Sequence, residues 1–156
     1  MISLKIQWKN LITCLAIPLA VGGLSALLTQ NSMETFNSII KPALAPPGWL
    51  FPVVWTILYI FMGIASYLVI MSQKPYDTAL IVYSLQLIFN FFWSIIFFNL
   101  RKYLFAFIWL VLLWLLILQT ALLFYKISKP AGYLMLPYLL WVTFAGYLNF
   151  SIYLLN

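Results

Sequence analysis

Residues 103–125 read YLFAFIWLVLLWLLILQTALLFY, and this stretch decides the fold class of the chain. It contains no Lys, Arg, Asp or Glu, and it is apolar all round rather than along one stripe. A helix needs about 20 apolar residues to cross the hydrocarbon core of a bilayer. The stretch therefore predicts a membrane-spanning helix.

Four further runs have the same character. None of them contains a charged residue: 11–28, 49–71, 78–100 and 131–155. Over the whole chain 66% of the residues are hydrophobic and 6% are charged, whereas soluble domains carry about 25% charged residues. A transmembrane barrel would show shorter segments of alternating hydrophobicity. The sequence thus predicts an all-α, multi-pass membrane protein in which residues 1–156 form one domain, a bundle of five transmembrane helices.

The residue types that are rare in this chain exclude several classes of site. There is no His, there is one Cys, and the acidic residues are Glu34 and Asp77. Catalytic triads and zinc, copper or non-haem iron sites depend on His or on several Cys residues, so we expect no acid–base catalytic set, no metal and no cofactor. The net charge of +6 comes from cations scattered between apolar runs. This scatter is typical of helix-end anchors and not of a nucleic-acid-binding surface.

The N-terminal run leaves two interpretations open. Lys5 and Lys9 precede it, and Ala20-Val21-Gly22 would pass as a cleavage site, as in a secretory signal peptide. The run continues apolar to Leu28, which favours a retained helix. With five spans, the N-terminal side of the membrane collects five of the eight cations, so the positive-inside rule favours a cytoplasmic N-terminus.

The one long connection, residues 30–48, joins the first two spans. Apolar residues at helical spacing are followed there by prolines: Met33, Phe36, Ile40, Pro42, Pro46 and Pro47. Long loops in compact bundles are usually functional or disordered. We expect a short amphipathic helix and a stiff proline segment that together lie on the bundle as a lid.

Three of the spans carry aromatic and amide side chains along one helical face. The faces are formed by Trp55, Tyr59, Met62 and Ser66; by Gln86, Asn90 and Ser94, with Trp93 beside them; and by Tyr138, Trp141, Ala145 and Asn149. Polar groups within spans face the bundle interior, because lipid offers them no partners. The amides can hold helices together by hydrogen bonds, or the faces can wall a chamber for a planar apolar ligand. Periodicity leaves both interpretations open, with Trp55 and Trp141 as the better candidates for ligand contact.

Four stretches match the pattern of a known family, in the right order. They are Lys41-Pro42-x-x-x-Pro46-Pro47-x-Trp49, Val54-Trp55-x-x-Leu58-Tyr59-x-x-Met62-Gly63, Gln86-Leu87-x-x-Asn90-x-x-Trp93 and Pro137-Tyr138-Leu139-x-Trp141-x-x-Phe144-Ala145-x-x-Leu148-Asn149. The chain resembles the translocator protein or tryptophan-rich sensory protein family, TspO/MBR. The resemblance implies a five-helix bundle, often a homodimer, with an internal pocket capped by the loop between the first two spans. Members of that family bind porphyrins and related tetrapyrroles, eukaryotic members also bind cholesterol, and some bacterial members are reported to promote light-dependent porphyrin breakdown.

The resemblance also implies a set of site residues. It places pocket positions at Trp55, Asn90, Trp141 and Ala145, with Tyr59 and Asn149 nearby, and lid positions at Lys41, Pro42, Pro46, Pro47 and Trp49. The pocket positions coincide with the helical faces described above, and we add Trp93 to them. Two features depart from the family pattern. Leu44 stands where the family usually has Trp, and the fifth span ends without the cation that marks sterol-binding members.

We therefore expect an integral membrane receptor for porphyrin-type tetrapyrroles that acts in stress or tetrapyrrole regulation. The porphyrin is a ligand and not a cofactor, and a lipid or sterol is the alternative partner. Lys41 or Arg101 would meet the propionates of the porphyrin. The chain would be a homodimer in the cytoplasmic membrane of a bacterium. Two alternatives stay open: photo-oxidative breakdown of the porphyrin, which Leu44 weakens, and translocation of tetrapyrroles or lipids.

Overall fold

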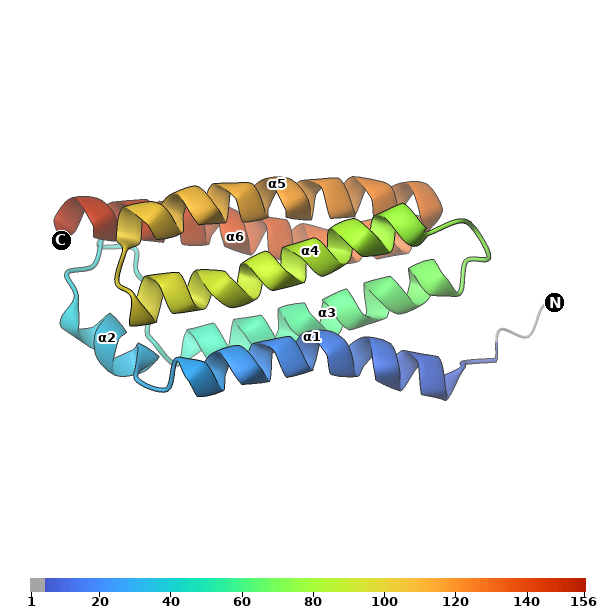
Figure 1. Ribbon diagram of the computed structural model, residues 1–156, viewed down its shortest axis with the longest axis horizontal. Helices are drawn as coiled ribbons and strands as arrows, with labels where there is room; N and C mark the ends of the chain where they lie inside the picture. The colour runs from blue at the N-terminus through green and yellow to red at the C-terminus, as the bar shows by residue number, and fades with distance from the viewer. Residues whose placement is uncertain (1–4) are drawn as a thin grey trace.

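The computed structural model describes residues 5–156, and the regular elements in this range are helices. Figure 1 shows them in chain order: α1 (Trp8–Leu28), α2 (Ser32–Ser38), α3 (Leu50–Ile70), α4 (Asp77–Ser94), the π-helical turn η1 (Ile95–Asn99), α5 (Tyr103–Ile127) and α6 (Lys129–Leu155). Of the helices in the described range, α1, α3, α4 with η1, α5 and α6 are long and apolar enough to cross a membrane. The prediction of an all-α bundle with five membrane-spanning helices is confirmed.

The largest difference from the expected helix bounds is at the N-terminus. The helix α1 begins at Trp8 instead of at Leu11, because the Leu11 N–H already donates to the Gln7 carbonyl oxygen at 3.0 Å. Apolar side chains are needed to cross the lipid but not to form the helix, so hydropathy marks the edge of the hydrocarbon core and not the first helical residue. The helix extends over Lys9 and Asn10 into the interfacial region.

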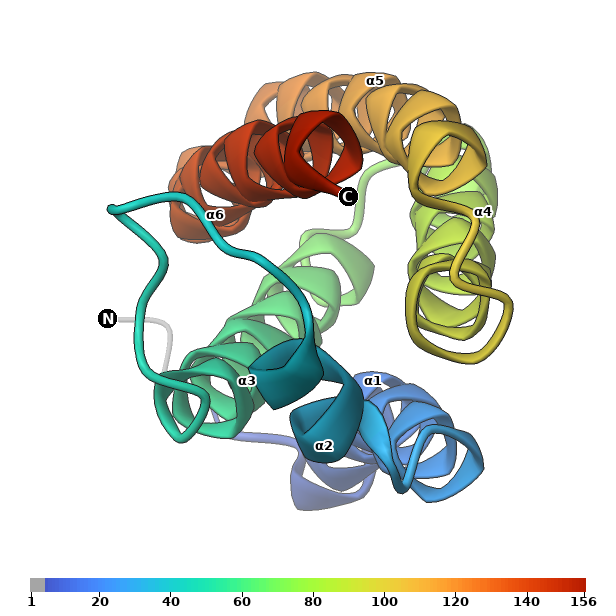
Figure 2. The same cartoon turned by 90° about the vertical axis from the view of Figure 1, so that its left-hand side faces the viewer.

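The five long helices form a ring in the order α1, α3, α6, α5 and α4, and α4 returns to α1. Helices that are distant in the sequence are therefore neighbours, α3 and α6 above all. The short helix α2 and the loop after it lie across one end of the bundle, beside the C-terminal end of α6 (Figure 2). This is the position that the sequence predicts for a lid.

The close packing of α1 on α3 depends on Gly63. A Cβ atom at this position would lie 2.8 Å from Leu15 Cα and 2.9 Å from the Cys14 carbonyl oxygen. Because these are backbone atoms, they cannot rotate away from an added methyl group. Small residues at helix crossings let backbones approach closely in membranes, where dispersion contacts drive association. The retained-helix interpretation of the N-terminal run agrees with this packing.

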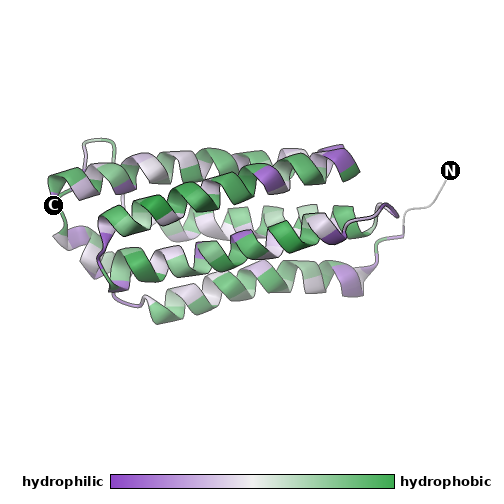
Figure 3. Cartoon of the chain, turned by 45° about the horizontal axis from the view of Figure 1, so that its top comes forward, coloured by the Kyte–Doolittle hydropathy of each residue, from purple (hydrophilic) through white to green (hydrophobic). Residues whose placement is uncertain are grey.

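The outward faces of the bundle carry large apolar side chains. Ile57, Ile81, Leu112 and Leu140 are each between 45% and 69% exposed, and Figure 3 shows hydrophobic residues, in green, along the long helices. A soluble protein rarely exposes contiguous apolar surface on this scale. The chain is thus an integral, multi-pass membrane protein.

Candidate ligand-binding cavity

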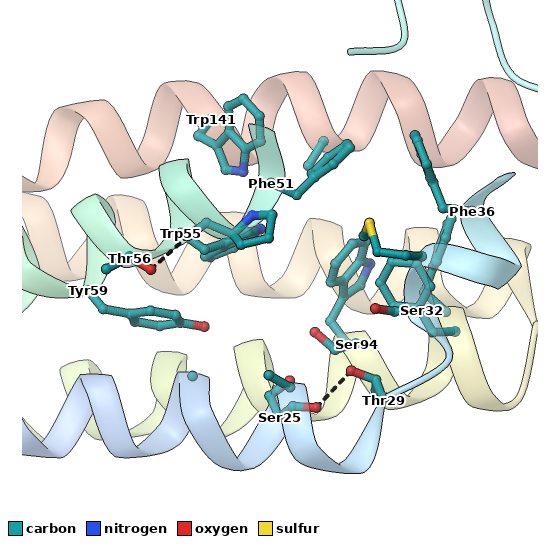
Figure 4. A pocket seen from close by; sticks show the side chains of 18 of the residues that line it. Ser25, Thr29, Ser32, Phe36, Phe51, Trp55, Thr56, Tyr59, Ser94 and Trp141 are labelled. Atoms are coloured by element: carbon teal, nitrogen blue, oxygen red, sulfur yellow. Dashed lines mark hydrogen bonds between the residues drawn. The ribbon is translucent and has the colours of Figure 1, made fainter. Parts of the chain in front are cut away.

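A cavity of about 360 Å³ lies at the end of the bundle that α2 covers. Side chains from α1, α2, α3, α6 and the α4–η1 junction surround it (Figure 4). Along α3 the lining residues run from Phe51 to Tyr59, whereas Met62 and the buried residues beyond it belong to the solid core. The same division occurs on α6, where Trp141 lines the cavity and Met135 is completely buried in the core. The bundle is therefore hollow in one half and solid in the other.

The sequence-predicted ligand positions divide into two groups. The cavity is lined by Trp55, Tyr59, Trp93, Trp141, Ala145 and Asn149. Asn90 lies outside the lining and is 2% exposed. The structure thus brings most of the predicted positions to one cavity, and the ligand contacts themselves stay predictions.

Asn90 connects three helices through a chain of buried hydrogen bonds. The Tyr59 hydroxyl donates to Asn90 Oδ1 at 3.0 Å, and Asn90 Nδ2 donates to the Tyr138 hydroxyl oxygen at 2.6 Å. The Tyr138 hydroxyl in turn donates to Gln86 Oε1 at 2.8 Å. These bonds join α3, α4 and α6 at the boundary between the hollow and solid halves. For Asn90 and Gln86 the geometry favours the helix-joining interpretation.

The side chains of Trp93 and Asn149 also form a hydrogen bond between two helices. Trp93 Nε1 donates to Asn149 Oδ1 at 3.1 Å, and Asn149 Nδ2 donates to the Tyr103 carbonyl oxygen at 2.8 Å. The Trp93 ring stacks on Phe97, with ring centroids 5.3 Å apart. What Trp93 offers to the cavity is therefore mainly an apolar ring.

Trp55 and Trp141 form an aromatic wall on the α3–α6 side of the cavity. Trp55 meets Tyr59 at a centroid distance of 5.6 Å, and Trp141 meets Phe51 edge-on at 5.8 Å. Within the described residues, the buried side-chain polar atoms without a hydrogen-bond partner are Trp141 Nε1 and the Tyr83 hydroxyl. The Trp141 nitrogen faces the cavity in Figure 4, whereas Tyr83 belongs to the solid core. The cavity wall thus holds one buried donor that the protein leaves free.

The remaining polar groups of the cavity are uncharged. Hydroxyls of Ser25, Thr29, Ser32 and Ser94 gather on the side opposite the aromatic wall, near α2 (Figure 4). No Lys, Arg, Asp or Glu of the described residues lines the cavity. The arrangement is suited to a flat, largely apolar ligand with a few neutral polar groups.

The helix α2, which belongs to the predicted lid, contributes Ser32, Met33 and Phe36 to the cavity lining. Lys41 holds the end of this helix: its Nζ donates to the Phe36 carbonyl oxygen at 2.8 Å and lies 4.9 Å from the centroid of the Phe36 ring. A cation at a helix C-terminus satisfies free carbonyl groups and the helix dipole. Arg101 is also engaged with the lid, because its Nη2 donates to Thr35 Oγ1 at 3.4 Å.

The proline segment of the lid lies outside the cavity. Lys41, Pro42, Pro46, Pro47 and Trp49 are absent from the lining, and Trp49 is 67% exposed. Leu44, which replaces the Trp of the family pattern, is 70% exposed. The segment positions α2 over the cavity, and it makes no wall of its own.

Sequence reasoning missed the contribution of α1. This helix lines the cavity with Leu19, Gly22, Gly23, Ser25 and Ala26. The small residues of α1 predict close helix packing. The helix has no aromatic or amide face of the kind that indicated a cavity on the other spans. Gly22 shows the consequence, because the Tyr59 ring lies directly against it and leaves no room for a Cβ atom.

Known proteins resemble this chain over most of its length. The model of the TspO/MBR family matches residues 14–155. The "Tryptophan-rich protein TspO" of Chlorobaculum tepidum is 40% identical over 154 residues, covering 96% of this chain and 98% of the relative. The "Tryptophan-rich sensory protein" of Cereibacter sphaeroides is 34% identical over 98% of this chain and 95% of its own length. The "Translocator protein" of Bos taurus is 30% identical over 94% of this chain and 89% of its own length. The chain belongs to the TspO/MBR family.

Proposed function

We propose that this protein is a membrane receptor that binds a porphyrin-type tetrapyrrole in the cavity beneath α2. The observation that supports this most directly is the aromatic wall of Trp55 and Trp141 with its free indole N–H. A flat macrocycle matches the wall in shape, because aromatic rings pack well against each other in offset or edge-on geometry.

The free N–H of Trp141 adds a directional element. A buried donor without a partner costs about 1–3 kcal/mol, and lipid supplies no acceptor at this depth. A ligand acceptor opposite Trp141 Nε1, such as a ring nitrogen or a peripheral carbonyl oxygen, would remove that cost. Binding energy would then depend on both the indole ring and its nitrogen.

The side chains of the cavity do not favour coordination of a central iron. The chain has no His, and its one Cys, Cys14, is absent from the cavity lining. Haem iron is usually held by His, Cys, Met or Tyr, and the Tyr59 hydroxyl is already bonded to Asn90. Met33 of the lid is the remaining lining residue of these types. We therefore expect free-base porphyrin to bind at least as well as haem.

A titration of the purified protein with protoporphyrin, followed by the shift of the Soret band, tests the proposal. Trp141→Phe keeps a ring and removes the donor, so affinity should fall about fivefold, the equivalent of one neutral hydrogen bond. The double variant Trp55→Ala, Trp141→Ala should lose at least about tenfold. Trp114→Phe is the matched control, because Trp114 bonds to Thr143 and lies outside the cavity. Unchanged affinity in the double variant would place the porphyrin elsewhere.

Light-dependent breakdown of the porphyrin is a second candidate, favoured by the position of Trp55 and Trp141 at the cavity wall. An excited macrocycle can take an electron from Trp and pass it to dissolved dioxygen, which would be the oxidant for the breakdown, so no acid–base residue is needed. We also propose a homodimer in a bacterial cytoplasmic membrane. Ala16 and Ala20, exposed on the outer face of α1, support a close contact between two copies.

A further inference from the structure

The cavity has a polar end that the aromatic wall does not explain. Ser25, Ser32 and Ser94 come from α1, α2 and the end of α4, and all three line the cavity at the end that α2 covers (Figure 4). Ser25 is 6% exposed. Thr29 beside them donates its hydroxyl to the Ser25 carbonyl oxygen at 2.7 Å. No hydrogen bond engages the hydroxyls of the three serines within residues 5–156.

These hydroxyls lie in a region without charge. No ionised side chain of the described residues lines the cavity. Lys41 and Arg101 lie outside the cavity lining: Lys41 bonds to the carbonyl oxygens of Phe36 and Ile39, and Arg101 bonds to Thr35. An ionised carboxylate placed among the serines would lose its hydration without gaining a counter-ion, which is strongly unfavourable. A neutral hydroxyl or carbonyl group would instead gain hydrogen bonds that no protein group competes for.

We propose that Ser25, Ser32 and Ser94 form a subsite that receives a neutral hydroxyl or carbonyl group of the ligand and excludes an ionised carboxylate. This inference rests on the proposed function, because it assumes that the cavity receives a flat apolar ligand. It also assigns an orientation to that ligand in the cavity. The ring system lies against Trp55 and Trp141, and a neutral polar edge points toward the lid. Ionised propionates of a porphyrin must then lie outside the cavity.

A comparison of two porphyrins tests the subsite with the full chain in lipid nanodiscs. Protoporphyrin dimethyl ester has neutral carbonyl groups where protoporphyrin has carboxylates. The ester should bind at least as tightly as the diacid at neutral pH. In the double variant Ser25→Ala, Ser94→Ala the affinity for the ester should fall about fivefold or more, since at least one neutral hydrogen bond is lost. Ser84→Ala is the matched control, because Ser84 bonds to Leu80 of its own helix and lies outside the cavity.

A second measurement needs no porphyrin. In a Cys14→Ala background, Ser94→Cys places a thiol in the subsite, and Asn37→Cys places one on the exposed side of α2. Hydroxyethyl methanethiosulfonate is neutral, and the sulfonatoethyl and trimethylammonioethyl reagents carry opposite charges. At position 37 all three should react readily. At position 94 the anionic reagent should react at least about tenfold more slowly than the neutral one, relative to position 37.

The outcomes separate this inference from the proposed function. Tight binding of the diacid with exclusion of the ester overturns the subsite and leaves a porphyrin receptor in place. Faster reaction of the anionic reagent than of the cationic one at position 94 also overturns it, since it would reveal an anion site. Binding of neither porphyrin overturns the proposed function, and the thiol reactions alone then decide whether the subsite excludes anions.

Discussion

Asn90→Leu distinguishes a residue that joins helices from one that contacts ligand. The substitution keeps the branched shape of the side chain and removes two interhelical hydrogen bonds, from Tyr59 at 3.0 Å and to Tyr138 at 2.6 Å. Interhelical hydrogen bonds average about 0.6 kcal/mol each, and a stranded buried donor costs about 1–3 kcal/mol. Tyr138 keeps its bond to Gln86, whereas the Tyr59 hydroxyl loses its acceptor, Asn90 Oδ1. We expect the free energy of unfolding to fall by roughly 2–4 kcal/mol.

The assay is reversible unfolding in mixed micelles by added dodecyl sulfate, followed by circular dichroism, with a porphyrin titration of the same samples. In the Asn90→Leu variant the Tyr59 hydroxyl has no acceptor, so removing it should restore part of the lost free energy of unfolding. Tyr59→Phe should therefore lower the free energy of unfolding by about 1 kcal/mol less in the Asn90→Leu background than in the unaltered protein. Asn37→Leu on the exposed side of α2 is the control. Unchanged stability together with a more than tenfold loss of porphyrin affinity would refute this reasoning and make Asn90 a ligand contact.

Three further predictions concern packing, the lid and chemistry. Gly63→Ala should lower the free energy of unfolding by about 1–3 kcal/mol in the same assay, because its methyl group meets the α1 backbone; an unchanged transition would contradict the close approach. Lys41→Met should speed porphyrin release in stopped-flow measurements by about two- to fivefold, since a cation at a helix C-terminus is worth about 0.3–1 kcal/mol; release at the original rate would show that the Lys41 contacts do not hold the lid. Under illumination, protein-bound protoporphyrin should lose its Soret band faster than porphyrin in micelles alone, and Trp55→Phe, Trp141→Phe should slow the loss; equal rates with and without protein would remove the enzymatic candidate.

The fold could be predicted from the sequence because the membrane imposes a simple rule. Each span must be long and apolar, and each break carries charge or proline, as at Arg101 and Pro130. The rule does not fix helix ends in the interfacial region, so α1 begins earlier than the apolar run suggests. It also does not predict η1, where the Leu100 N–H donates to the Ile95 carbonyl oxygen at 3.0 Å and widens the last turn. Such π-helical turns depend on local packing and often occur near functional sites.

The candidate site could be predicted only in part, because periodicity identifies an inner face without measuring what fills it. Trp141 and Asn90 both lie on inner faces, yet one lines the cavity and the other is buried in a hydrogen-bond network. Side-chain partners decide between these roles, and partners on other helices are invisible along one chain. The cavity wall on α1 had no signal of this kind, since Gly22 and Ser25 are ordinary residues for close helix packing.

The division of each helix into a hollow and a solid half connects stability to function. The side chains that line a cavity lack dispersion contacts on one side, so contacts outside the cavity must fix their positions. The Asn90 network lies where the hollow half ends, and Tyr59 belongs to both parts: its ring lines the cavity and its hydroxyl is fixed to Asn90. The ring of Trp55 packs in turn on Tyr59 and on Tyr138. Asn90, Gln86 and Tyr138 therefore orient the aromatic wall from outside the cavity lining, and substitutions at these three positions should change affinity through the position of Trp55 rather than through a lost ligand contact.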